Sequence, residues 1–197
     1  MPAAPVDAAT AARQCAVAVL SARARFGLKG PEAAAWLQAR GVDLPAGVNT
    51  WAGQSDGALV ARLGRSEFLI ADGPVAGRSA GLAEALGDGT DGCWPVLRSD
   101  ACLLLAGERV PELLAQTCNV DLRITDPAAR AVTMTSVAGV AVTAAVAQSA
   151  PAWRVALWHD PSFATYLHDT LGAIAAELGG GPCALAALET TGPLFWR

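Results

Sequence analysis

Two stretches of the chain, LKGPEAAAWLQARGVDL at residues 28–44 and LAGERVPELLAQTCNVDL at residues 105–122, follow the same pattern. In each stretch a glycine follows the end of an expected strand, a run that favours a helix comes next, and Val-Asp-Leu closes the stretch. Aligning Gly30 with Gly107, with a later gap of one residue, brings the two Val-Asp-Leu triplets together. Chance similarity between helices rich in Ala and Leu is the alternative. The shared order of elements favours an internal duplication.

The sequence around these stretches predicts strands and helices in both halves. The signals are alternation of side chains, turn residues and glycines that end helical runs. In the first half we expect strands at 22–28, 57–63 and 67–71 and helices at 32–40 and 78–86. In the second half we expect strands at 101–105, 130–136, 140–147 and 153–158 and helices at 108–117 and 161–178. The expected fold class is α+β, with two duplicated halves of antiparallel strands plus helices.

The last of these helices carries an apolar stripe at helical spacing, which we expect to face the core. Its members are Phe163, Tyr166, Leu167, Leu171 and Ile174.

The Gly-rich turn at 87–92 is the expected boundary between the halves. The Ala-rich opening of the chain indicates a loose leader. We therefore expect a leader at 1–21, a single duplicated domain at 22–178 with halves of about 22–92 and 93–178, and a C-terminal tail at 179–197.

The composition points to a protein that meets a partner protein. Of the 197 residues, 53% are hydrophobic and only 16% are charged, so little charge is available to cover the surface. A net charge of −4 disfavours nucleic acid, whose binding needs clustered Lys and Arg. The absence of an apolar run of membrane length and of a secretory signal leads us to expect a soluble protein of the cytoplasm.

The sequence offers no self-sufficient catalytic or metal-binding apparatus. Its five cysteines are scattered without CxxC spacing, and its two histidines, His159 and His168, have no neighbouring acidic ligand pattern. No Ser or Cys lies in a recognised nucleophile motif, and the glycine-rich turns complete no phosphate-binding loop. We therefore expect no catalytic residue and no metal ligand on this chain, and leave its cofactor-binding residues unassigned.

Two sets of residues nevertheless have more than one interpretation. Asp43 and Asp121 close the two repeated stretches and could converge as a proton-transfer pair if one were buried with a raised pKa, or could each cap a turn, which we favour. Five tryptophans could line a pocket for a flat heterocycle, although core and interface roles are commoner; they are Trp51, Trp94, Trp153, Trp158 and Trp196.

The order of motifs over about residues 22–178 resembles the gamma subunit of heterotetrameric sarcosine oxidase, a family related to the aminomethyltransferase and tetrahydrofolate-binding fold. The motifs that carry the resemblance are Leu28-Lys29-Gly30-Pro31, Asp43-Leu44-Pro45 to Val48-Asn49, Leu63 to Ile70, Leu105 to Ala115, Cys118 to Leu122 and Pro161 to Leu167. The chain departs from the family pattern at Leu97-Arg98-Ser99-Asp100 and near Ile124. The resemblance therefore supports a class of N-methyl amine oxidising complex rather than one substrate.

This resemblance implies an accessory role in oxidative N-demethylation. FAD, FMN, NAD and tetrahydrofolate are implied to bind on larger alpha and beta subunits, against which a gamma-type chain packs without catalytic residues of its own. The alternative is a free-standing tetrahydrofolate-binding protein of the same fold. We expect Trp51, Phe195 and Trp196 to contribute to the subunit interface, because large aromatic side chains often anchor such contacts.

Overall fold

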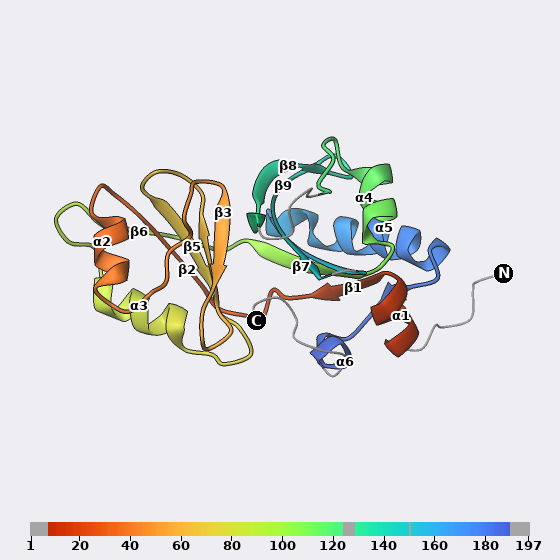
Figure 1. Ribbon diagram of the computed structural model, residues 1–197, viewed down its shortest axis with the longest axis horizontal. Helices are drawn as coiled ribbons and strands as arrows, with labels where there is room; N and C mark the ends of the chain where they lie inside the picture. Colours follow the sequence, from red (N-terminus) through yellow and green to blue (C-terminus); the bar gives the residue numbers. More distant parts are fainter. Residues whose placement is uncertain (1–7, 124–128, 150, 190–197) are drawn as a thin grey trace. The chain divides into compact units, whose positions relative to one another are not determined.

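The computed structural model describes residues 8–123, 129–149 and 151–189, which form two sheets with flanking helices (Figure 1). The helices are α1 (Ala8–Gln14), α2 (Ala33–Gln38), α3 (Arg78–Leu86), α4 (Val110–Thr117), η2 (Pro161–Phe163), α5 (Ala164–Glu177) and α6 (Leu185–Glu189). The strands are β1 (Ala16–Val19), β2 (Arg25–Lys29), β3 (Thr50–Gly53), β4 (Leu59–Arg62), β5 (Glu67–Ala71), β6 (Trp94–Val96), β7 (Ala101–Gly107), β8 (Val132–Val137), β9 (Val140–Ser149), β10 (Ala152–His159) and β11 (Gly181–Pro182).

The five-stranded sheet has the order β3-β4-β5-β2-β6, and all its neighbouring strands are antiparallel. Phe26 and Leu28 of β2 point to one face of this sheet because side chains alternate along a strand. They pack in one buried cluster with residues of α2 and α3, including Leu37 and Leu82. The two helices therefore cover this face of the sheet (Figure 1).

The six-stranded sheet has the order β11-β1-β7-β10-β9-β8. The pairs β1–β7, β7–β10 and β10–β9 are antiparallel, and β1 pairs with β11 in parallel. Leu103 and Leu105 of β7 belong to a buried cluster that includes Leu113 of α4 and Leu167 and Leu171 of α5. Two helices thus cover one face of this sheet as well.

The sheet orders confirm the duplication and show that the halves exchange strands. The order β3-β4-β5-β2-β6 matches β8-β9-β10-β7-β1, with β11 added at the edge. The first strand of the first half, β1, pairs with β7, whereas the first strand of the second half, β6, pairs with β2. Each half of the sequence therefore completes the sheet of the other half.

The turn between strand and helix repeats in detail. Gly30 has φ 135° and Gly107 has φ 131°, a region that favours glycine. Two residues later, the N–H of Glu32 donates to the carbonyl of Gly92 at 2.9 Å, and the N–H of Arg109 donates to that of Gln14 at 2.8 Å. The same turn thus joins each helix to the segment that precedes the exchanged strand.

The repeat fades beyond the helices. Leu37 and Leu114, which the alignment pairs, are both buried. Val42 is also buried, whereas Val120, its counterpart in the second Val-Asp-Leu triplet, is 46% exposed. The triplets match in letters but not in packing.

The division of the chain differs from the one expected. Among the described residues, one compact unit comprises 8–21, 100–123, 129, 133–149 and 151–189, and the other comprises 22–99 and 130–132. The first unit boundary lies after residue 92 because β6 keeps the chain in the five-stranded sheet. The expected leader belongs to the unit of the second half because β1 lies between β7 and β11.

The segments expected as a leader and a tail contain regular structure. Residues 8–19 of the expected leader contain α1 and β1, and 179–189 of the expected tail contain β11 and α6. Ala16, Val17 and Ala18 of β1 are buried. A short run of Ala and Val gives little signal in the sequence, because the alanine side chain has little apolar surface to bury.

Most predicted elements are present, and α3 has the bounds that the sequence predicts. The apolar stripe of the last helix is partly wrong: Leu167 and Leu171 are buried, but Phe163 is 45% exposed and Tyr166 is 51% exposed. Phe163 lies in the 3₁₀ turn before α5, so its direction does not follow the α-helical spacing.

Candidate functional site

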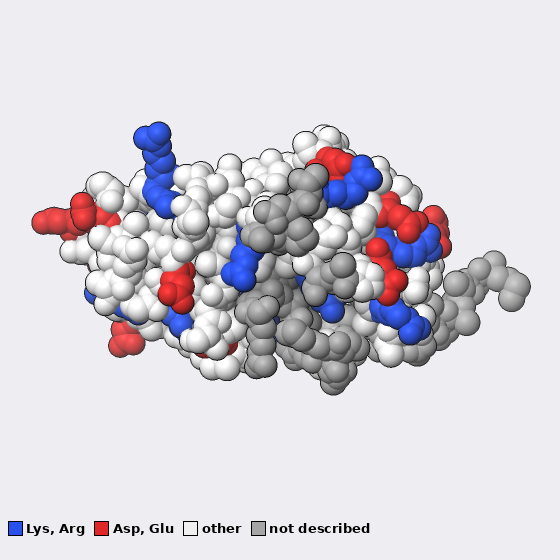
Figure 2. Space-filling model, in the orientation of Figure 1, with Lys and Arg blue, Asp and Glu red and all other residues white. Residues whose placement is uncertain are grey.

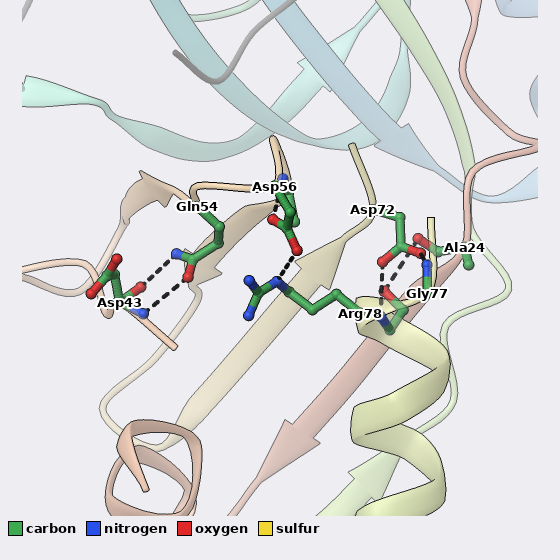
Figure 3. A network of polar contacts seen from close by, with 9 residues as sticks. Ala24, Asp43, Gln54, Asp56, Asp72, Gly77 and Arg78 are labelled. Carbon is green, nitrogen blue, oxygen red and sulfur yellow. Dashed lines mark hydrogen bonds and ion pairs between the residues drawn. The ribbon is translucent and has the colours of Figure 1, made fainter. Parts of the chain in front are cut away.

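Asp43, one of the two candidate acids, follows α2 and is exposed. Its backbone is held by the side chain of Gln54, which is 5% exposed. The Asp43 N–H donates to Gln54 Oε1 at 3.0 Å, and Gln54 Nε2 donates to the Asp43 carbonyl at 2.8 Å (Figure 3). This pair of bonds ties the segment after α2 to the end of β3, which is a structural role for the backbone of Asp43.

Asp121, the second candidate acid, is exposed and paired with Arg123. Its Oδ1 accepts hydrogen bonds from the backbone N–H of Arg123 at 3.0 Å and from Arg123 Nε at 2.8 Å. The side-chain hydrogen bonds from Arg123, followed by the backbone bond, lower the pKa of Asp121 to about 2. A proton-transfer acid would need a raised pKa, so Asp121 is a turn residue held by its neighbour.

A further set of acids organises the start of α3. Asp72 is 2% exposed and accepts hydrogen bonds from the backbone N–H groups of Gly77 and Ser79, each at 2.8 Å (Figure 3). Arg78 Nε donates to Asp56 at 2.6 Å. Burial alone would raise the pKa of Asp56, but the Arg78 hydrogen bond and the other hydrogen bonds outweigh it and lower that pKa. These contacts fix a helix end rather than prepare a reactive group.

The thiols and imidazoles also have structural settings. Burial raises the pKa of the Cys15 thiol to about 12, which keeps it protonated and unreactive. His159 is 3% exposed, and its Nδ1 lies 2.9 Å from the Asp160 carbonyl. The tautomer that carries its proton on Nδ1 donates a hydrogen bond to this carbonyl. His168, in α5, lies beside Asp169. Within 8–123, 129–149 and 151–189, no group of three or more His, Cys, Asp or Glu could hold a metal ion.

One pocket of about 350 Å³ lies in the unit that contains the six-stranded sheet. Its lining combines apolar side chains with the Asp121–Arg123 pair, and includes Leu114, Cys118, Asp121, Leu122, Arg123 and Trp153. The volume is at the small end of ligand pockets, which span about 300–1,000 Å³. Among the predicted tryptophans that the structure describes, Trp153 alone lines this pocket, and the residue is 7% exposed.

The remaining predicted aromatic residues lie in different settings. Trp51 is 5% exposed, and the guanidinium of Arg130 lies 5.0 Å from its ring centre, so this chain already covers the side chain. Trp158 is 4% exposed. Phe195 and Trp196 lie outside the described residues. The predicted interface role of Trp51, Phe195 and Trp196 stays a prediction.

Several large apolar side chains are exposed although the sequence did not predict them to be at an interface. They include Val75, Trp94, Leu97, Met134, Phe163 and Tyr166. Figure 2 shows charged side chains as separate spots among broad uncharged areas on the face that it draws. The sequence signal that could have located part of this surface is the apolar Trp94-Pro95-Val96-Leu97 run after a glycine-rich turn, which is too short and too close to proline for a central strand.

Comparison with known proteins identifies the fold. No protein-family model and no curated protein sequence matches the chain. The chain is similar to a chain of the heterotetrameric sarcosine oxidase from Corynebacterium sp. U-96 in complex with pyrrole 2-carboxylate, with a TM-score of 0.67 and 25% identity over 88% of this chain and 93% of that chain. It is also similar to the glycine cleavage system aminomethyltransferase T from Bartonella henselae, with a TM-score of 0.68 and 15% identity over 93% of this chain.

These matches confirm the resemblance and the fold that the sequence indicates. The similarity to the sarcosine oxidase chain runs over nearly the whole length of both chains. By contrast, the chain spans about half the length of the aminomethyltransferase, since 51% of that chain is covered. In the part of the chain that the structure describes, no helix is long and apolar enough to cross a membrane.

Proposed function

We propose that this chain is a non-catalytic, gamma-type subunit of a heterotetrameric, sarcosine-oxidase-like complex in the cytoplasm. The complex oxidatively N-demethylates a methylated amino acid, and the released one-carbon unit passes to tetrahydrofolate. The observation that carries this proposal is the similarity to one chain of heterotetrameric sarcosine oxidase over 88% of this chain and 93% of that chain. The match covers 93% of that chain, which supports a counterpart of that chain in such an assembly.

The settings of the acidic side chains support a non-catalytic role. Asp72 and Asp56 are engaged in fixing α3, and the pKa of Asp121 is lowered, not raised. The pocket beside α4 contains an acid already paired with Arg123, whereas proton transfer needs an acid or base poised near neutral pH. The proposal assigns the chemistry to the larger alpha and beta subunits, which would carry FAD, FMN, NAD and tetrahydrofolate.

The exposed apolar side chains support docking as the task of this chain. Leu97 is 91% exposed and Met134 59%, and an isolated chain would leave both in water. Burial of such side chains against a partner is favourable by about 25 cal/mol for each Å² of apolar surface removed from water. The low charge content of the sequence fits the same role, because charged residues are depleted at the cores of subunit interfaces.

The test is to co-express the chain with the flavin-binding oxidase subunits of the same organism and to purify the assembly through a tag on the largest subunit. The chain is expected to co-purify in stoichiometric amount. In parallel, the isolated chain is titrated with tetrahydrofolate in a calorimeter. Micromolar binding by the isolated chain would favour the free-standing folate-binding protein and would contradict the proposal.

A further inference from the structure

One edge strand of the five-stranded sheet and the residue that follows it carry two exposed apolar side chains. This edge strand is β6, which pairs with β2 and with no strand on its other side among the described residues. Trp94 opens β6 and is 48% exposed, and Leu97 follows the strand and is 91% exposed. Tryptophan is one of the residue types enriched among the side chains that contribute most to binding at protein interfaces.

The indole of Trp94 is held in place by glycines. A Cβ atom built on Gly30 would lie 3.0 Å from Trp94 Cε3, and one built on Gly89 would lie 3.0 Å from Trp94 Cδ1. The ring therefore packs against backbone that carries no side chains. Both glycines have positive φ, 135° and 121°, so this backbone conformation disfavours any other residue. A fixed indole loses little conformational entropy when a partner covers it.

The edge of β6 disfavours the addition of a further strand. Pro95 pairs with Leu28, and proline has no N–H with which to bond that strand. The pair is therefore of the type that exchanges no hydrogen bonds, and the nitrogen of Pro95 faces the open edge. An incoming strand would find no donor there, so a partner must contact this edge mainly through side chains.

An unbalanced positive charge lies beside the indole. Lys29, the only lysine of the sequence, is directly opposite Trp94 in the β2–β6 register and is exposed. Glu67 is opposite Lys29 on the other side, in β5, but its carboxylate accepts a hydrogen bond from Arg98 at 2.9 Å. Within the described residues, no ion pair is formed by Lys29. A partner that covers Trp94 would stabilise this ammonium by presenting a carboxylate.

We propose that Trp94, Leu97 and Lys29, together the β6 edge patch, dock this chain onto a larger subunit of the oxidase complex. The partner surface is an apolar pocket that receives the indole and is bordered by Asp or Glu facing Lys29. This inference rests on the proposed function and makes it specific. It also places the interface tryptophan at position 94, in a setting that Trp51 lacks.

The first experiment measures binding of the purified chain to the larger subunits by biolayer interferometry. Trp94→Ala is expected to weaken binding about 30-fold or more, which corresponds to the 2 kcal/mol typical of an interface hot spot. Val75→Ala is the matched control, because Val75 is 61% exposed in the same unit but lies outside the patch. Lys29→Glu is expected to weaken binding more than Lys29→Gln. Circular dichroism of each variant checks that the fold is intact.

The second experiment uses the single lysine. An amine-acetylating reagent modifies Lys29 in the free chain, and this labelling is expected to be lost in the assembled complex. If the complex forms, but Trp94→Ala binds as Val75→Ala does and Lys29 stays reactive, the patch is wrong and the proposed function stands. If the wild-type chain does not associate with the larger subunits, the proposed function is refuted and the patch with it.

Discussion

Replacing Gly107 by alanine is expected to destabilise the protein strongly. A Cβ at this position would lie 2.4 Å from the carbonyl oxygen of Gln14, and the backbone has φ +131°. Backbone strain of this kind costs about 1–3 kcal/mol. The steric overlap adds about 1–3 kcal/mol, as overpacking does elsewhere. The sum of about 2–6 kcal/mol is a large share of the roughly 5–15 kcal/mol that stabilises a typical native protein.

Thermal unfolding followed by circular dichroism measures this effect. Each kcal/mol shifts Tm by about 2–4 °C for a chain of this size, so Gly107→Ala should lower Tm by at least about 4 °C. Gly30→Ala should do the same, because its Cβ would lie 2.2 Å from the carbonyl oxygen of Gly92. Gly81→Ala is the control: it lies within α3 with no atom near its Cβ, and should raise stability by about 0.5–1 kcal/mol. Equal effects of Gly107→Ala and Gly81→Ala would refute the reasoning about the repeated turn.

Three further predictions follow from single side chains. The folded state lowers the pKa of Asp121 from 3.8 to about 2, so its pairing with Arg123 stabilises the fold above pH 3.8, and this stabilisation is lost as the pH falls through 2. In Arg123→Gln the side-chain hydrogen bonds are lost but the backbone N–H of residue 123 still donates, so NMR titration should find the pKa of Asp121 raised toward 3.8 but still below it; an unchanged pKa would contradict the assignment. Asp72→Ala should destabilise the protein by about 1–3 kcal/mol in urea unfolding, since it leaves two backbone N–H groups at the start of α3 without their acceptor; a change within error would show that water replaces it. Cys15 should resist alkylation in the native protein while Cys183, which is partly exposed, reacts, as mass spectrometry of the alkylated chain would show; early modification of Cys15 would count against its burial.

The strand-to-helix turns could be predicted from sequence because their signals are local. Gly30 and Gly107 appear as glycines before helical runs, and the structure gives both a positive φ. The exchange of β1 and β6 could not be predicted in this way. Which strand pairs with β2 or β7 is decided by segments far apart in the chain, and no local pattern encodes that choice.

The aromatic residues show a second limit of local reasoning. Trp51 and Trp94 are the same residue type, yet one is 5% exposed and the other 48%. Trp51 lies in β3, where Arg130 from a distant part of the sequence reaches its ring, and Trp94 lies on the edge strand over glycines. The candidate acids were easier to judge, because Asp121 is bound by Arg123 only two residues away. Local contacts are readable in a sequence, whereas burial by distant segments is not.

Native mass spectrometry of the complex co-expressed from its subunits tests the central claim most directly. If this chain is a gamma-type subunit, the assembly carries it at one copy per complex, and its dissociation in the gas phase releases a 20.0 kDa species. When the larger subunits are expressed without this chain, their complex should be lighter by the mass of this chain and should keep every other component. The claim is contradicted if the larger subunits assemble to the same mass whether or not this chain is present, while the chain itself stays free at 20.0 kDa.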